Sequence, residues 1–225
     1  MAPRAPTNPA KSTAPHAPGP GRPKDLAKRE AILEASKRLF VQLGFDAVSM
    51  DQIAAEAGVS KLTVYSHFGD KDALFVAAVK SHCEQGMPTS LLEDRPDVPL
   101  AVRLLEVATA FYAMISSPEA IAGHRILCSP QLANTPLPQM FWEAGPRRVQ
   151  EGFAALLDAR VAAGQLFIDD TELAASQFFT LLKGEPHARL VFGCACASDA
   201  ITGMVPEAHV AACVELFLRA YARPQ

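Results

Sequence analysis

The sequence predicts an all-α protein in which a small three-helix unit precedes a larger helical domain. Apolar residues recur with the 3.6-residue period of a helix along most of the chain after residue 24, and alternating strand patterns are almost absent. Residues 49–68 have the composition of two short helices joined by a tight turn. Glycine and proline then divide residues 86–225 into about five further helices.

The composition is that of a globular protein. Hydrophobic residues make up 49% of the 225 positions, but no apolar run reaches the roughly 18 residues of a membrane-spanning helix. The N-terminus lacks the apolar core of a secretory signal, and the five cysteines are scattered and odd in number. We therefore expect a protein of the reducing cytoplasm, without a membrane partner and without a disulfide framework.

The formal net charge of −3 is distributed unevenly along the chain. Residues 1–24 carry a net charge of +4, residues 25–85 a net charge of −2, and residues 86–225 a net charge of −5. A basic N-terminal end and an acidic C-terminal part indicate contact with nucleic acid at one end and a different role for the rest.

Residues 1–24 form the first predicted segment, a basic tail rich in proline. It has little that could enter a hydrophobic core, so we expect it to be disordered. Two interpretations remain open. The tail is either an inert extension or an arm whose Arg22 and Lys24 contact a DNA backbone or minor groove.

The first helix is predicted over residues 25–43. Its apolar positions recur every three to four residues, which places them on one face. Gly44 provides the C-terminus, because glycine readily adopts the conformation that ends helices. The residues of this face are Ile32, Leu33, Ser36, Leu39, Phe40 and Leu43.

Two short helices separated by a glycine turn are predicted between Ser49 and Phe68. Ser49 is suited to cap the first helix, with Gln52 at the spacing of a capping box. Gly58 provides the turn, and Ser60 is suited to cap the second helix. That second helix combines short polar, aromatic and cationic side chains, which suit contacts with phosphates and base edges. The pattern is that of a helix-turn-helix whose second helix recognises DNA.

A fourth helix is expected to begin at Asp70, directly after Gly69. The N–H groups of its first turn, together with Lys71, would form a phosphate clamp. The small core inside these helices is expected to be weak alone, because a short domain buries little apolar surface. The residues of this core are Leu39, Phe40, Ile53, Val64, Phe68 and Phe75.

The C-terminal part is predicted to contain helices over residues 99–116, 119–128, 138–163, 171–194 and 207–222. Gly145 and Pro146 predict a kink in the third of these helices, and Gly184 and Pro186 predict a bend in the fourth. Loops are expected over residues 91–99 and 132–138. The apolar face of the first helix is expected to consist of Val102, Leu105, Ala108, Thr109 and Tyr112.

The last two predicted helices are more apolar than one small bundle requires. A two-fold pairing would bury the surplus in a four-helix interface, so we expect a homodimer through these helices. The alternative is that both faces pack inside a monomer. The residues concerned are Leu173, Phe178, Leu181, Leu182, Val210, Val214, Phe217, Leu218 and Tyr221.

A family resemblance lies in residues 31–75, which read AILEASKRLFVQLGFDAVSMDQIAAEAGVSKLTVYSHFGDKDALF. This stretch resembles the TetR family of transcriptional regulators, and residues 141–146 and 177–193 resemble the subgroup with an AefR-like C-terminal region. The resemblance implies a helix-turn-helix DNA-binding domain over residues 25–85 and a ligand-binding and dimerisation domain over residues 86–225. It further implies a dimeric repressor that a small-molecule effector releases from a DNA operator.

The resemblance also implies roles for individual residues. The expected DNA contacts are Arg22, Lys24, Ser49, Lys61, Leu62, Thr63, Tyr65, His67 and Lys71. Tyr65 and His67 would face phosphates, and Lys71 would bind phosphate at the start of the fourth helix. Lys61 and Leu62 would lie nearer the bases. Many family members have a small residue in place of Leu62, and a leucine that meets a thymine methyl would select a different operator.

An effector pocket is expected between the C-terminal helices. The candidates are Phe111, Met114, His124, Arg125, Cys128, Trp142, Phe178 and Phe179. An aromatic stripe at helical spacing also occurs in an ordinary core, and His124 and Arg125 could instead pair with surface glutamates. Cys194 and Cys196 lack the spacing of a zinc or thioredoxin-like pair, which leaves a redox role and an ordinary structural role open.

No catalytic, metal or cofactor motif stands out in the sequence, which has no phosphate-binding loop, no nucleophile elbow and no HExxH. We therefore expect a non-enzymatic, ligand-responsive repressor that acts as a dimer on a near-palindromic operator and needs no cofactor or metal. The alternative with the same motif is a ligand-independent activator or architectural DNA binder. A helical enzyme with an appended DNA-binding unit is a third hypothesis, against which the lack of a catalytic cluster argues.

Overall fold

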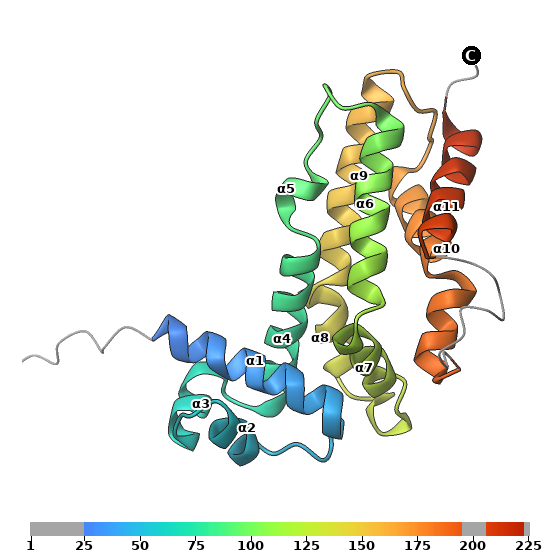
Figure 1. The fold of residues 1–225 in the computed structure, drawn as a ribbon. Helices are drawn as coiled ribbons and strands as arrows, with labels where there is room; N and C mark the ends of the chain where they lie inside the picture. The colour runs from blue at the N-terminus through green and yellow to red at the C-terminus, as the bar shows by residue number, and fades with distance from the viewer. Residues whose placement is uncertain (1–24, 195–205, 223–225) are drawn as a thin grey trace, which may run out of the picture.

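The computed structural model describes residues 25–194 and 206–222, which form the predicted all-α fold. Figure 1 shows three N-terminal helices lying across one end of a bundle, and a fourth helix leading from that end into the bundle. No single helix in the described ranges is long and apolar enough to cross a membrane; one pair passes that test together but is bent by 65°. Arg22, Lys24 and Cys196 lie outside the described residues.

The N-terminal helices, called the head below, are α1 (Leu26–Leu43), α2 (Met50–Glu56), α3 (Lys61–Phe68) and α4 (Lys71–Gly86). Ser49, Ser60 and Asp70 cap the last three, as predicted. The capping box is confirmed, because Oγ of Ser49 accepts from the N–H of Gln52 at 3.2 Å and the N–H of Ser49 donates to Oε1 of Gln52 at 2.8 Å. Short-range side-chain contacts therefore fix where each helix of the head begins.

The remaining helices, called the body below, are α5 (Thr89–Leu92), α6 (Leu100–Ile115), α7 (Pro118–Leu127), α8 (Leu137–Ala144), α9 (Pro146–Ala162), α10 (Thr171–Phe192) and α11 (Pro206–Tyr221), with a 3-10 turn at Pro130–Leu132. The one-turn helix α5 was not predicted, because four residues show no periodicity.

The predicted helix over residues 138–163 is in fact two helices. Gly145 leaves the helical region, with φ −143° and ψ −65°, and Pro146 starts α9.

The buried face of α6 differs from the predicted one. Val102 and Leu105 are 47% and 42% exposed, whereas Leu104 and Val107 are fully buried. Arg103 lies on the same buried face, and a charged residue there concealed the apolar stripe. Its Nη2 donates to the carbonyl oxygens of Leu91 and Glu93 and its Nη1 to the carboxylate of Glu106, while its Nε has no partner among the described residues. The prediction is confirmed for Ala108 and Tyr112, which are buried, and is wrong for Val102, Leu105 and Thr109, which are exposed.

A second buried arginine fastens the connection between α5 and α6. Nε of Arg160 donates to the carboxylate of Asp94 at 2.6 Å, and Nη2 donates to the carbonyl oxygens of Arg95 and Val98. Arg160 is almost fully buried, so these partners offset the loss of its hydration. Arg103 and Arg160 together bind backbone on both sides of residue 94, and they hold this connection against α6 and α9.

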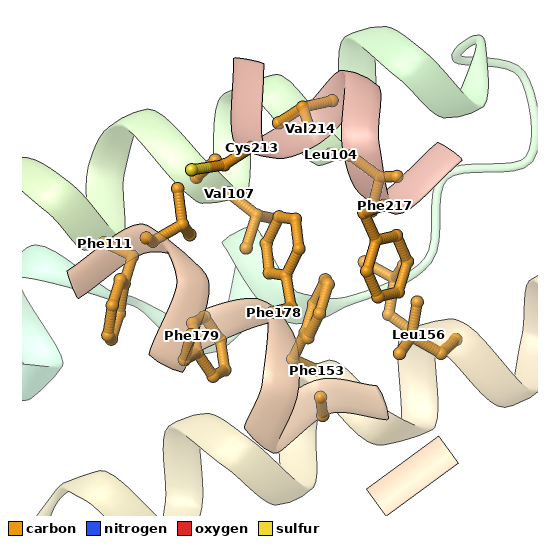
Figure 2. Packing of buried hydrophobic residues seen from close by; sticks show 14 of the residues in the cluster. Leu104, Val107, Phe111, Phe153, Leu156, Phe178, Phe179, Cys213, Val214 and Phe217 are labelled. Carbon is orange, nitrogen blue, oxygen red and sulfur yellow. The ribbon is translucent and has the colours of Figure 1, made fainter. Parts of the chain in front are cut away.

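The core of the body is built from interlocking aromatic rings (Figure 2). Phe178 of α10 stacks on Phe153 of α9 with ring centroids 4.8 Å apart, and it meets Phe217 of α11 edge-on at 4.9 Å. Val210 and Val214 of α11 are buried in the same cluster. These side chains, assigned above to a surplus for dimerisation, pack inside one protomer instead, and so does Leu182.

The head completes its core with residues of the body. Phe40, Phe45 and Phe75 form a triangle of rings with centroids 5.4 to 5.7 Å apart. Leu137, the first residue of α8, is only 1% exposed and belongs to this same cluster, and Phe141 of α8 packs against it. The predicted weakness of the head core is thus offset by contact with the body.

The predicted bend in α10 occurs at Gly184, where φ is 46° and ψ is −158°. Pro186 has no N–H, so it cannot donate to the carbonyl of Leu182 as a helical residue would. Nε2 of His209 on α11 contacts that carbonyl oxygen at 2.9 Å and replaces the missing donor. The bend is therefore held by α11, which Figure 1 shows beside α10.

Leu137→Ala is expected to lower the free energy of unfolding by about 3 kcal/mol, because it opens a cavity in the shared core. The measurement is urea denaturation followed by circular dichroism. The matched control is Met140→Ala, one turn later on α8, where the side chain is exposed and a change below about 0.5 kcal/mol is expected. Equal effects of the two substitutions would contradict a shared core.

Candidate functional site

The outer face of α3 projects three of the predicted DNA-contacting residues into solvent. Val64 is fully buried and anchors the helix in the head, while Leu62 is 79% exposed and Tyr65 is 42% exposed. Lys61 lies on the same exposed side. Figure 1 shows α2 and α3 at the end of the molecule opposite the connection from α5 to α6. This face is free of contacts with the body and is presented as a recognition helix requires.

The ammonium of Lys61 is held by a neighbouring acid. Its Nζ lies 2.9 Å from a carboxylate oxygen of Asp51 on α2 and 6.0 Å from the ring centroid of Tyr65. The hydrogen bond and charge of Asp51 raise the pKa of Lys61. Both partners are exposed, so the pair adds little stability, but it orients the cation across the junction of α2 and α3.

Three other predicted contacts are partly engaged within the head. The hydroxyl of Ser49 is occupied by the capping box, and that of Thr63 lies 2.8 Å from the hydroxyl of Ser60. His67 is half-buried, with its ring centroid 6.1 Å from that of Phe68. These side chains border the exposed face of α3.

Lys71 has a structural role that the sequence did not indicate. Its Nζ donates to the carbonyl oxygens of Phe45 at 2.9 Å and Val48 at 3.1 Å, and it lies 4.4 Å from the ring centroid of Phe45. Two of its three N–H donors are therefore used to fasten the segment that leads into α2. Lys71 positions the helix-turn-helix, whatever contact it also makes with phosphate.

A cavity of about 250 Å³ lies where the head meets the body. Five of the eight predicted pocket residues line it, namely Phe111, Met114, His124, Trp142 and Phe179. The sequence predicted a pocket between C-terminal helices only. In the structure, Phe40 of α1 and Phe75 and His82 of α4 also line it, so the head forms part of the wall.

Three predicted pocket residues do not line the cavity. Arg125 donates from Nε and Nη2 to the carbonyl oxygens of Val191 and Leu190, both at 2.8 Å, and so caps the end of α10. Cys128 is exposed beyond the end of α7. Phe178 points into the body core, because neighbouring positions on a helix face different directions. The structure therefore places these three residues outside the cavity wall.

The helix α10 contributes more of the cavity wall than was predicted. Its lining residues are Ser176, Phe179, Thr180 and Lys183. Their spacing of three and four residues defines one helix face, and this periodicity was the signal in the sequence that could have revealed them. Lys37 of α1 and Cys83 of α4 line the cavity as well, and burial raises the pKa of the Cys83 thiol to about 11.

Two imidazoles meet at the edge of the cavity. Nε2 of His187 on α10 lies 3.3 Å from Nδ1 of His124 on α7, so one nitrogen donates a hydrogen bond and the other accepts it. Burial lowers the pKa of His124 to about 4, with smaller contributions from the charges of His187 and Lys183. Burial lowers the pKa of His187 as well. Both rings are therefore neutral at pH 7.

A change in pH tests this burial. In the unfolded chain the His124 imidazole has its ordinary pKa of 6.5, and in the folded protein its pKa is about 4. Between these two pH values the imidazole is protonated in the unfolded chain and neutral in the folded protein. Protonation of His124 in the unfolded chain therefore does not affect the free energy of unfolding above pH 6.5, but it lowers that free energy as the pH falls below 6.5. His124→Gln is expected to reduce the loss of unfolding free energy between pH 8 and pH 5 by about 1–2 kcal/mol. Denaturation curves at pH 8 give the pH-independent effect of the substitution, and parallel pH profiles of the two proteins would refute the prediction.

Two family models match the chain. The model of the AefR-like transcriptional repressor C-terminal domain matches residues 102–223, and the model of the bacterial regulatory proteins of the tetR family matches residues 32–78. The first match covers much of the body and the second covers most of the head.

Three relatives carry names that describe transcriptional regulators. The HTH-type regulator YdeS of Bacillus subtilis (strain 168) is 30% identical over 150 residues, 65% of this chain and 71% of YdeS. The repressor BdcR of Escherichia coli (strain K12) is 35% identical over 97 residues, 42% of this chain and 49% of BdcR. The activator FasR of Mycolicibacterium smegmatis (strain ATCC 700084 / mc(2)155) is 40% identical over 62 residues, 28% of each chain.

Two solved structures share the fold along most of the chain. A TetR-family transcriptional regulator from Mesorhizobium loti MAFF303099 has a TM-score of 0.73 and 28% identity, with 88% of this chain and 98% of that chain covered. The flavonoid-responsive regulator FrrA has a TM-score of 0.63 and 30% identity, with 89% of this chain and all of FrrA covered.

Proposed function

Because the chain belongs to the TetR family of transcriptional regulators and has an AefR-like C-terminal domain, we propose that it is a ligand-responsive repressor that binds a near-palindromic operator as a homodimer. The proposed domains are the DNA-binding domain of residues 25–85 and the effector-binding and dimerisation domain of residues 86–225. The named relatives are regulators, and no enzymatic activity is proposed for this chain.

The observation that carries this proposal is the composition of the cavity wall. Side chains of α1 and α4 in the head line the same cavity as side chains of α6 to α10 in the body. A molecule bound there touches both parts at once. Its affinity would therefore depend on how the head and the body are arranged. An effector needs such a difference in affinity between two arrangements in order to shift the equilibrium between them. The structural relative FrrA, a flavonoid-responsive regulator, supports a response to a small molecule.

The proposed DNA contacts lie on α3 and its borders. In a dimer, two copies of α3 would enter successive major grooves, about 34 Å apart along the duplex. Leu62 and Lys61 would lie nearest the bases, and Leu62 is free to meet a thymine methyl because no residue of the head covers it. Tyr65 would bond a phosphate, and Lys71 would hold the loop before α2.

The proposed dimer surface is the outer face of α11 with the adjoining part of α10. The buried aromatic rings of these helices belong to the protomer core, so a different set of residues must form the contact. Ala208, Ala212, Leu216 and Ala220 are exposed and recur every four residues, which makes a smooth apolar stripe along α11. Small side chains allow two such helices to approach closely.

The second candidate is a ligand-independent activator. The name of the relative FasR, a transcriptional activator, favours it. The two functions use the same DNA-binding face but differ in the sign of regulation. A reporter gene placed behind the selected operator would be silenced by a repressor and stimulated by an activator.

Selection from random duplex DNA tests the proposed function directly. We expect an inverted repeat with half-sites about 10 base pairs apart. Recovery of no preferred sequence, or of a single asymmetric half-site, would refute the dimeric operator complex.

Substitutions in the head separate DNA contact from positioning. Tyr65→Ala is expected to weaken operator binding about tenfold with little loss of unfolding free energy, because the ring is 42% exposed and its contact with the ammonium of Lys61 is a long one at the surface. Lys71→Met is expected to weaken operator binding and also to lower the unfolding free energy, because the carbonyls of Phe45 and Val48 lose their donor. Fluorescence anisotropy and urea denaturation give the two quantities. Tyr65→Phe is the control that retains the ring and removes only the hydroxyl.

Ala212→Arg tests the dimer surface. A long charged side chain in the centre of the stripe on α11 is expected to shift the protein from dimer to monomer, as measured by sedimentation velocity. The matched control is Ala155→Arg, on the exposed side of α9, which should leave the dimer intact. A dimer that survives Ala212→Arg would place the interface elsewhere.

A further inference from the structure

The cavity contains one lysine whose charge no described residue balances. Lys183 of α10 lines the cavity, and within residues 25–194 and 206–222 it makes no ion pair or hydrogen bond. The second lysine in the wall differs in this respect. Nζ of Lys37 on α1 lies 2.8 Å from Glu34 and within 3.4 Å of side-chain oxygens on α4. Lys183 is therefore the available cation.

The groups around Lys183 do not compensate its charge. Two titratable groups interact with it electrostatically, His124 and His187, and they repel it when they are protonated. Ser176 and Thr180, on the same lining face of α10, carry no charge. Burial lowers the pKa of Lys183 because the ammonium has lost part of its hydration. Glu119 also lines the cavity, but it is exposed at the start of α7 and pairs with no lysine of the described residues. An unbalanced ammonium in such a place is costly, and a bound anion would offset the cost.

The rest of the wall is largely apolar, and six aromatic side chains contribute to it. Phe111 and Phe179 face each other with ring centroids 4.3 Å apart, and Phe141 lies 6.2 Å from the His124 ring. Trp142 and Phe75 line other parts of the cavity. Such a wall favours a flat, apolar molecule, and about 250 Å³ is enough for a body of one or two fused rings.

We propose that the cavity takes an aromatic monoanion, whose ring system lies among the phenylalanines and whose carboxylate or ionised phenol oxygen binds Nζ of Lys183. This assignment rests on the proposed function only in naming the cavity as the effector site. The neutral imidazole of His124 provides a second polar contact without adding charge. Cationic aromatic molecules are disfavoured, because Lys183 would repel them.

Matched probes with and without the charge test the assignment. The pair is 2-naphthoate and 2-naphthamide, which have the same ring system and nearly the same shape. We expect the wild-type protein to bind naphthoate about tenfold more tightly than naphthamide, in line with one charge-assisted hydrogen bond. Titration calorimetry measures both affinities, and Trp142, the only tryptophan of the chain, gives a fluorescence signal at the cavity.

Three variants locate the charge preference. Lys183→Met is expected to remove the tenfold preference and leave the affinity for naphthamide unchanged, whereas Lys183→Arg should retain the preference. The control is Lys80→Met, which removes an exposed lysine of α4 outside the cavity. Equal binding of the two probes to wild type, binding of neither, or a preference that survives Lys183→Met would each overturn the assignment. Thermal denaturation confirms that each variant is folded.

Operator affinity, measured separately by anisotropy, keeps this inference distinct from the proposed function. Lys183-dependent binding of naphthoate with unchanged operator affinity would support the anion site and refute the ligand-responsive repressor. Release of the operator by naphthamide but not by naphthoate would support the repressor and overturn the anion site.

Discussion

The structure depends on a core that the head cannot complete alone. Four short helices enclose the rings of Phe40, Phe45 and Phe75, and Leu137 of the body fills the remaining space. A unit of about 60 residues buries too little apolar surface to dispense with such help. The stability of the DNA-binding unit is thereby tied to α7 and α8, which pack on α1 and α4. The cavity lies at the same junction.

The form of α10 follows from what its two sides must contact. One side buries Phe178 against α9 and α11, and the other presents Phe179 and Lys183 to the cavity. The helix then bends at Gly184, and His209 of α11 contacts the carbonyl oxygen of Leu182 that the bend leaves without a helical donor. The helix α11 stabilises this bend and also carries the exposed apolar stripe. A partner bound to the stripe would therefore contact the helix that holds α10, and with it the cavity wall, in place. The proposed dimer contact and the proposed ligand site would thus involve neighbouring faces of the same two helices.

The sequence predicted what neighbouring residues determine and failed where distant residues decide. The caps at Ser49, Ser60 and Asp70 involve groups within three positions, so the helix starts were recognisable. The face of α6 was missed because Arg103 becomes a core residue only when the carbonyls of Leu91 and Glu93 reach it. Lys71 was predicted to bind DNA phosphate and Arg125 to line the effector pocket. Both donate to backbone carbonyl oxygens distant in the sequence, which no local pattern reveals. The participation of the head in the cavity wall likewise arises from tertiary contact alone.

An anion held by Lys183 would connect these features energetically. Its charge would fix it to α10, while its rings would lie in a cavity that Phe40 and Phe75 of the head also line. A ligand anchored to the body in this way would favour arrangements of head and body in which α1 and α4 do not clash with it. In the proposed dimer, operator DNA would favour the arrangement that gives the two α3 helices the spacing of successive major grooves. Where these arrangements differ, linkage requires that DNA weaken the ligand by the same factor by which the ligand weakens DNA binding. In the proposed complex, Lys183 would therefore influence both which molecule binds and how strongly that molecule opposes operator binding.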